Sequence, residues 1–126
     1  MSGYSFDADI VIDALLGLDL AKAELRRATS GRGRAWLSRM SWMDVMAMAE
    51  EKALRETEAF LSGFAVDEID EEIAGRAAAL RRDRPALGAA DAIAFASALV
   101  RGRVFVTRNI QDFPAAMPGI RVPYNL

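Results

Sequence analysis

Short apolar runs alternate with longer amphipathic segments along the whole chain. In the longer segments, apolar residues recur every three or four positions, which is the spacing of one helix face. This pattern predicts helices over residues 9–16, 18–29, 41–55, 67–82 and 91–101, with another short helix before Gly63. The short runs have the length and composition of buried strands, and they are Tyr4 to Phe6, Arg34 to Met40, Phe64 to Val66, Val104 to Val106 and Ile120 to Val122.

The alternation of strands with helices predicts an α/β fold. Parallel strands need a crossover connection, so the pattern favours a central parallel β-sheet of about four or five short strands flanked by helices on both faces. The length of 126 residues, without repeats, linkers or low-complexity tracts, predicts a single domain over residues 1–126. In such sheets, ligands bind beyond the carboxyl ends of the strands. Residues that directly follow strands are therefore the first candidates for a site.

The composition narrows the chemistry available at such a site. The chain contains no histidine and no cysteine, which excludes a Ser-His triad, a thiol nucleophile, a thiolate zinc site and an imidazole base. An enzyme with this sequence has to rely on carboxylates, and clustered carboxylates prefer hard cations such as Mg²⁺ or Mn²⁺. No apolar stretch approaches the length of a membrane span, and acids interrupt the first apolar run. We therefore expect a soluble, cytoplasmic protein.

Four aspartates occupy positions that suit a carboxylate site. Asp7 directly follows the first predicted strand, and Asp112 follows the fourth by a few residues. Asp44 and Asp91 lie at the predicted starts of two helices. Three of the four could converge on one edge of the sheet, where like charges about 4 Å apart repel by roughly 4 kcal/mol. Such a cluster persists only when it is protonated or neutralised by a cation.

Each of these aspartates also has an ordinary structural explanation. Asp7 or the neighbouring Asp9 could cap the first helix, and Asp44 nearly completes a capping box that begins at Ser41. Asp91 ends a loop as a helix cap would, Asp112 suits a turn, and Asp67 is expected to cap the helix over residues 67–82.

The net charge is only −2, but the charges are unevenly distributed. Six basic residues against one acid lie between Lys22 and Arg39, and nine acids against two basic residues lie between Glu50 and Glu72. The basic block is either a solvated helix face or a contact for a phosphate backbone. The candidates for RNA contact are Arg26, Arg27, Arg32 and Arg34.

The order of the four acidic segments resembles a known family. An apolar strand leads into Asp7-Ala8-Asp9-Ile10, and an acid lies in Ser41-Trp42-Met43-Asp44. Asp91 opens an alanine-rich helix, and a strand runs into Thr107-Arg108-Asn109-Ile110-Gln111-Asp112-Phe113. Together these segments cover nearly the whole chain, and they resemble the PIN-domain ribonucleases, in particular the VapC-type toxins of bacterial toxin–antitoxin pairs.

The resemblance implies a PIN-like fold and a Mg²⁺-dependent endoribonuclease, with Mn²⁺ as an alternative ion. It further implies an RNA substrate, a cognate antitoxin and a homodimer. Asp7, Asp91 and Asp112 would bind the metal, and Asp44 would join them as a catalytic residue, directly or through water. Asp9, Thr107 and Asn109 would support these ligands from behind. The family usually has glutamate where Asp44 stands, one bond or about 1.5 Å longer, and a small polar residue where Asp9 stands.

Two other functions remain open on the sequence. Asp7-Ala8-Asp9-Ile10-Val11 is also similar to the first motif of haloacid-dehalogenase-type phosphatases, in which Asp7 would be the nucleophile and Asp9 the acid/base. That similarity rests on one segment, whereas the PIN resemblance rests on four. A PIN-like domain with a weakened site could also act only as a binding module, and the short side chain of Asp44 keeps this alternative open.

Overall fold

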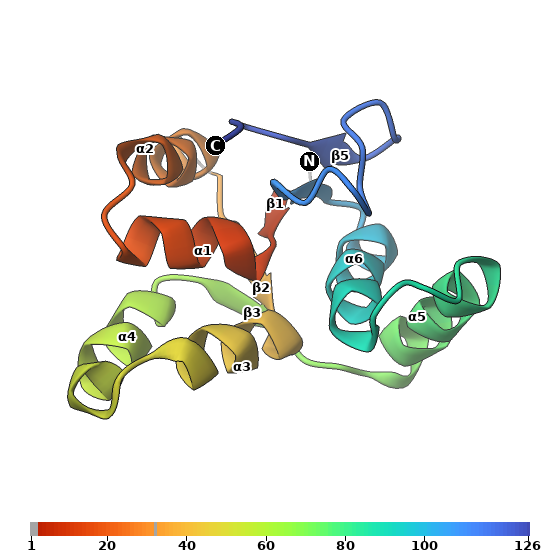
Figure 1. The fold of residues 1–126 in the computed structure, drawn as a ribbon, viewed down its shortest axis with the longest axis horizontal. Coiled ribbons are helices and arrows are strands. Elements are labelled where there is room, and N and C mark those ends of the chain that lie inside the picture. Colours follow the sequence, from red (N-terminus) through yellow and green to blue (C-terminus); the bar gives the residue numbers. More distant parts are fainter. Residues whose placement is uncertain (1–2, 32) are drawn as a thin grey trace.

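The computed structural model describes residues 3–31 and 33–126 and contains a five-stranded sheet with helices on both faces (Figure 1). The strands lie in the order β3-β2-β1-β4-β5, and every neighbouring pair is parallel. The predicted α/β fold with a parallel sheet is therefore confirmed. The strands are β1 (Tyr4–Phe6), β2 (Ala35–Ser38), β3 (Ala65–Asp67), β4 (Val104–Val106) and β5 (Ile120–Arg121).

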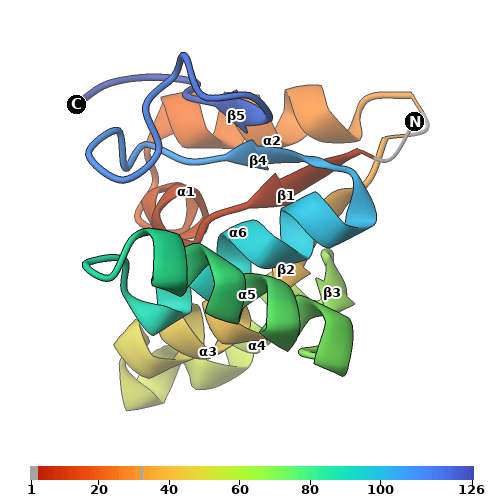
Figure 2. The ribbon, with the colours of Figure 1, turned by 90° about the vertical axis from the view of Figure 1, so that its right-hand side faces the viewer.

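Helices cover the sheet from both sides (Figures 1 and 2). One side carries α1 (Ala8–Leu15) and α2 (Asp19–Thr29), and the other carries α5 (Glu71–Asp83) and α6 (Ala89–Arg101). Between them, α3 (Arg39–Met48) contacts both α1 and α6, and it is followed by the short 3₁₀ helix η1 (Glu51–Ala53) and α4 (Leu54–Leu61). No helix among the described residues is long and apolar enough to cross a membrane.

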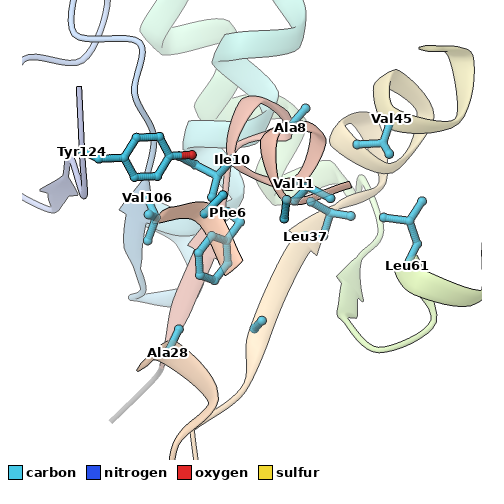
Figure 3. Close-up of a cluster of buried hydrophobic side chains, with 13 residues drawn as sticks. Phe6, Ala8, Ile10, Val11, Ala28, Leu37, Val45, Leu61, Val106 and Tyr124 are labelled. Carbon is cyan, nitrogen blue, oxygen red and sulfur yellow. The ribbon is translucent and has the colours of Figure 1, made fainter. Parts of the chain in front are cut away.

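The short strands supply side chains to a core on each face of the sheet. Phe6 and Val106 pack against α1 and α2, as Figure 3 shows. Phe105, the neighbour of Val106, points to the opposite face and packs against Phe95 and Phe113, with ring centroids 5.6 Å and 5.2 Å away. Because both faces of the sheet are buried, β4 is apolar throughout, and the serines that β1 and β2 carry, Ser5 and Ser38, are buried as well.

The predicted cap at Asp67 is wrong, and the caps that the sequence allowed at Asp44 and Asp91 do not form. Helix α3 begins at Arg39 because Ser38 caps it, accepting a hydrogen bond from the amide of Met40 at 3.1 Å. Ser41 is buried inside the helix, so no capping box forms there and Asp44 lies in the middle of α3. Gly88 occupies the cap position of α6, which leaves Asp91 in the first turn without a capping hydrogen bond. Asp70 instead of Asp67 caps α5, and Asp67 ends β3 in a buried ion pair with Arg103.

The order in which strands are added to the sheet reverses at β1. The chain leaves β1 toward β2 on one side and later adds β4 on the other side of β1. The amide of Asp7 donates to the carbonyl of Val106 at 2.8 Å, so the ends of β1 and β4 lie together. This divergence at the carboxyl ends is where parallel α/β sheets bind ligands, and it is the edge at which we expect the acids to meet.

Candidate metal centre

Acidic side chains from three helices line one cavity of about 460 Å³ at this edge. Asp7 and Asp9 come from the start of α1, Asp44 from the middle of α3, and Asp91 from the first turn of α6. The remaining lining residues are Ala8, Ile12, Ala47, Met48 and Asn109. Asp112 does not line the cavity but contacts Asn109, so the structure brings four of the predicted acids to the cavity and places the fifth behind it.

Asp7 is both the cap of α1 and the most buried acid of the cavity. It is 8% exposed, and its Oδ1 accepts a hydrogen bond from the amide of Ala8 at 2.9 Å. Its Oδ2 accepts one from the hydroxyl of Thr107 at 2.8 Å, and Thr107 is completely buried at the end of β4. The parallel pairing of β1 with β4 therefore fixes the position of the Asp7 carboxyl group.

No positive side chain in the described part of the chain forms an ion pair with Asp7. Burial, together with the nearby charges of Asp9 and Asp91, raises the pKa of Asp7 to about 7, against the opposing effect of the hydrogen bond from Thr107. At neutral pH this carboxyl group is therefore about half protonated, and a cation that binds it has to displace the proton.

Asp44 and Asp91 are also left without partners among the described residues. Burial raises the pKa of Asp44. Burial followed by the charges of Asp112 and Asp44 raises the pKa of Asp91. Neither side chain takes part in an ion pair or a hydrogen bond within the described ranges, so the cavity concentrates negative charge that the protein itself does not neutralise.

Asp9 has one engaged and one unengaged carboxylate oxygen. Its Oδ2 accepts a hydrogen bond from the amide of Arg108 at 3.2 Å, whereas its Oδ1 is buried without a partner. Burial raises the pKa of Asp9 as well. A buried oxygen without a donor is costly, and a cation or a proton would relieve that cost.

The loop after β4 holds the last of the predicted acids. The amide of Asn109 donates to the Thr107 hydroxyl at 3.0 Å, and its side-chain amide donates to Asp112 Oδ2 at 3.0 Å. The guanidinium of Arg84 donates to the backbone carbonyl of Asp112 at 2.7 Å and lies 3.8 Å from its carboxylate. Asp112 is thus held by neighbours on both sides.

The donor set fits a hard divalent cation. In the described ranges, no three acidic side chains converge closely enough to surround an ion by themselves. Mg²⁺ does not require this, since it keeps several water ligands and is usually held by one or two carboxylates together with substrate oxygens. The unpartnered Asp9 oxygen, the raised pKa values of Asp7 and Asp91 and the carboxylate oxygens of the lining are what such an ion would complement.

The predicted RNA-binding arginines lie away from the cavity. Arg27 pairs with Glu24 and contacts Tyr4 at the start of β1, and Arg34 directly precedes β2. Both positions are at the amino ends of the strands, where the end of α2 lies beside the start of β1 (Figure 2). Arg26 is exposed on the last turn of α2, and Arg32 lies outside the described residues.

Four residues next to these acids were not singled out by the sequence analysis. Asp13 and Tyr124 form a buried group with Arg108, and Arg84 holds Asp112. The sequence could have indicated Asp13, because it lies one turn after Asp9 in a very apolar helix and a buried acid needs a partner. Tyr124 and Arg84 had none, since their partners are distant in the chain.

With this geometry described, the family can be stated. The family model of the PIN domain matches residues 4–116, and the chain belongs to the PIN-domain family. A chain of a toxin–antitoxin complex from Klebsiella pneumoniae is similar at 34% identity with a TM-score of 0.87, over 98% of this chain and 99% of that chain.

Other solved structures share the fold at lower identity. A chain of the DNA-bound VapBC from Salmonella typhimurium is 25% identical, with a TM-score of 0.75 and 96% of both chains covered. A chain of FitAcB from Neisseria gonorrhoeae is 19% identical, with a TM-score of 0.76 over 98% of this chain and 99% of that chain, which shows the fold alone. No curated protein sequence matches this chain.

Proposed function

We propose that this protein is a Mg²⁺-dependent endoribonuclease that acts as the toxin of a toxin–antitoxin pair. The observation that carries the proposal is the set of carboxylates without positive partners, Asp7, Asp44 and Asp91, which three separate helices direct into one cavity. Membership of the PIN family and similarity to a chain from a toxin–antitoxin complex support it.

Within this proposal each residue has a defined task. Asp7, Asp91 and Asp112 would hold the cation, partly through its water ligands because no three acids among the described residues converge on one point. Asp44 would contact it directly or through water. When bound, the ion lowers the pKa of the attacking water and stabilises the leaving oxygen of the phosphodiester. Thr107 fixes the Asp7 carboxyl group, and Asn109 fixes that of Asp112, through the hydrogen bonds described above.

The proposal includes an antitoxin partner and a homodimer. A largely apolar groove of about 360 Å³ adjoins the cavity, shares Ile12 and Met48 with it, and includes the exposed Leu16 in its lining. We propose that the antitoxin covers this groove. A stable complex with the product of a small gene directly upstream would support this proposal, and a Leu16→Asp variant that still forms that complex would contradict the placement.

The phosphatase alternative loses its support in this geometry. Its general acid would be Asp9, but one oxygen of Asp9 is held by the amide of Arg108 and the other is buried. A lysine to hold the phosphoryl group is also missing, because Lys22 lies exposed on α2 and Lys52 is exposed beside Glu50.

The function is tested by cleavage of a panel of structured RNAs by the purified protein. Wild type should cleave with Mg²⁺ and stop with EDTA, and Asp7→Asn should lose at least ~100-fold in rate. Asp19→Asn is the matched control, since Asp19 is an aspartate at the start of α2 that is exposed and does not line the cavity. Folded wild type that cleaves no RNA would favour the binding module, and an active Asp7→Asn would contradict the site.

A further inference from the structure

One buried carboxylate next to the cavity is fully engaged, unlike the acids that line it. Asp13 is 7% exposed and lies one turn after Asp9 on α1. Its Oδ1 accepts a hydrogen bond from Nη2 of Arg108 at 3.1 Å, and its Oδ2 accepts one from Nε of Arg108 at 2.7 Å. The hydroxyl of Tyr124, near the end of the chain, also donates to Oδ2 at 2.8 Å. Both oxygens of Asp13 are therefore bound by donors of the protein itself.

Helix α1 holds Arg108 at two points. Asp9 accepts from its backbone amide at 3.2 Å, and Asp13 accepts from its guanidinium, so one face of α1 fixes both ends of the same residue. Arg108 stands between Thr107, which donates to Asp7, and Asn109, which binds Asp112. Because a peptide unit is planar, the bond from the Arg108 amide to Asp9 also fixes the orientation of the Thr107 carbonyl, and holding Arg108 limits how far Asn109 can move.

We propose that Asp13 is a positioning residue: by binding Arg108, with Tyr124 as a second donor, it holds the loop of residues 107–112 so that Asn109 lines the candidate metal centre and keeps Asp112 in place behind it. This inference rests on the proposed function. It assigns the Arg108 guanidinium to the loop instead of to RNA, since two of its three nitrogens bind Asp13. Partners that orient metal ligands from behind typically contribute about 10–100-fold to metal affinity.

The test compares two buried acids that each bind arginine. Asp13→Asn removes the charge and one acceptor oxygen, and Glu24→Gln does the same to an acid on α2 that binds Arg27 and Arg121. Calorimetric titration with Mn²⁺ should show about tenfold weaker binding for Asp13→Asn and wild-type binding for Glu24→Gln, although both melt earlier. Equal Mn²⁺ affinity in the two variants would reduce Asp13 to a stability role.

A second variant and a metal-free measurement complete the test. Tyr124→Phe keeps the buried ring and removes only the donor to Asp13, so it should weaken Mn²⁺ binding severalfold; it replaces Asp13→Asn if that variant does not fold. In metal-free protein, the amides of Arg108 and Asn109 should exchange hydrogen at least ~10-fold faster in Asp13→Asn than in Glu24→Gln. If wild type binds no Mn²⁺, the proposed function fails, and unchanged exchange at these amides then overturns the positioning role separately.

Discussion

Two regions of the molecule treat buried carboxylates in opposite ways. Between α2 and β5, Glu24 is 5% exposed and accepts hydrogen bonds from Arg121 at 2.6 and 2.9 Å and from Arg27 at 3.0 and 3.2 Å. Burial alone would raise the pKa of Glu24, but these arginines hold it below its usual range. In the cavity, burial raises the pKa of Asp7 and Asp91, and no arginine of the described residues opposes this effect.

The difference shows which acids serve the fold and which await a ligand. A buried carboxylate without a positive partner destabilises the protein. Such carboxylates gather at the diverging carboxyl ends of β1 and β4, which is where a parallel sheet binds ligands. We infer that their missing partner is a cation supplied from outside.

The largest expected difference between the two regions is in how a charge-removing substitution changes stability in the absence of divalent ions. Folded Asp7 binds its proton more tightly than the unfolded chain does, so its charge destabilises wild type progressively as pH rises from about 4 to about 7. Asparagine caps a helix as well as aspartate does. Asp7→Asn should therefore be more stable than wild type at pH 8. The gain is at most about 4 kcal/mol, since each unit of pKa shift corresponds to about 1.4 kcal/mol. The gain should vanish near pH 4.

Glu24→Gln should show the opposite sign and the opposite pH profile. The lowered pKa of Glu24 contributes stability above its unfolded value that is lost as pH falls. The free energy of unfolding of this variant should be about 2 kcal/mol lower than that of wild type at pH 8. The loss is smaller than for a fully buried ion pair because both arginines are about 40% exposed. Denaturant unfolding of both variants at pH 4 and pH 8 measures the contrast. If Asp7→Asn unfolds more easily than wild type at pH 8, the contrast is absent.

The next largest effect concerns Asp44, which lies in the middle of α3 and caps nothing. Asp44→Ala should lower Mg²⁺-dependent cleavage at least ~10-fold without lowering the melting temperature, because it removes an acid without a partner and favours the helix. Asp44→Glu should keep or raise activity, since it adds one bond of reach. Cleavage and thermal unfolding are measured together. An Asp44→Ala variant that melts earlier but cleaves normally would make Asp44 structural.

A smaller effect is expected for Asp9→Asn. The amide oxygen can still accept the hydrogen bond from Arg108, so RNA cleavage should fall less than ~10-fold, far less than in Asp7→Asn. Both variants are assayed on RNA and on a phosphomonoester. Phosphomonoester hydrolysis by wild type that disappears in Asp9→Asn would revive the phosphatase alternative.

The smallest effect is expected at the opposite edge of the molecule. Because Arg26 and Arg34 lie away from the cavity, only an RNA long enough to reach both edges can contact them. Replacing both with glutamine should lower the salt dependence of binding for a long RNA by a slope of about 1.4, at about 0.7 per phosphate contact, and leave short RNAs unaffected. An unchanged slope for the long RNA would make this block a solvated face.

The sequence predicted the fold well because hydrophobic periodicity is a local signal that the sheet preserves. The prediction of helix caps failed, because within one turn several residues are suitable as a cap. Ser38 and Ser41 are both good caps, and only the direct passage of β2 into α3 selects Ser38. Asp67 and Asp70 compete in the same way, and the partner that draws Asp67 away is Arg103, 36 residues further along the chain.

The acids of the candidate site could be predicted from the sequence, but the residues that hold these acids in place could not. Strand ends and motif spacing identified Asp7, Asp44 and Asp91, which the structure brings to one cavity. The contact of Tyr124 with Asp13 spans 111 residues and depends on how the end of the chain crosses α1. No local pattern encodes such a contact. The roles of all these residues in metal binding and catalysis stay predictions.

The central claim is that the unneutralised acids of the cavity bind a divalent cation, and Mn²⁺ calorimetry at pH 7 tests it most directly. With the pKa of Asp7 near 7, wild type should bind Mn²⁺ saturably and release protons, seen as a heat that changes with the ionisation enthalpy of the buffer. Asp7→Asn should lose both the binding and the buffer dependence. Saturable binding of equal strength in Asp7→Asn, or none in wild type, would contradict the account.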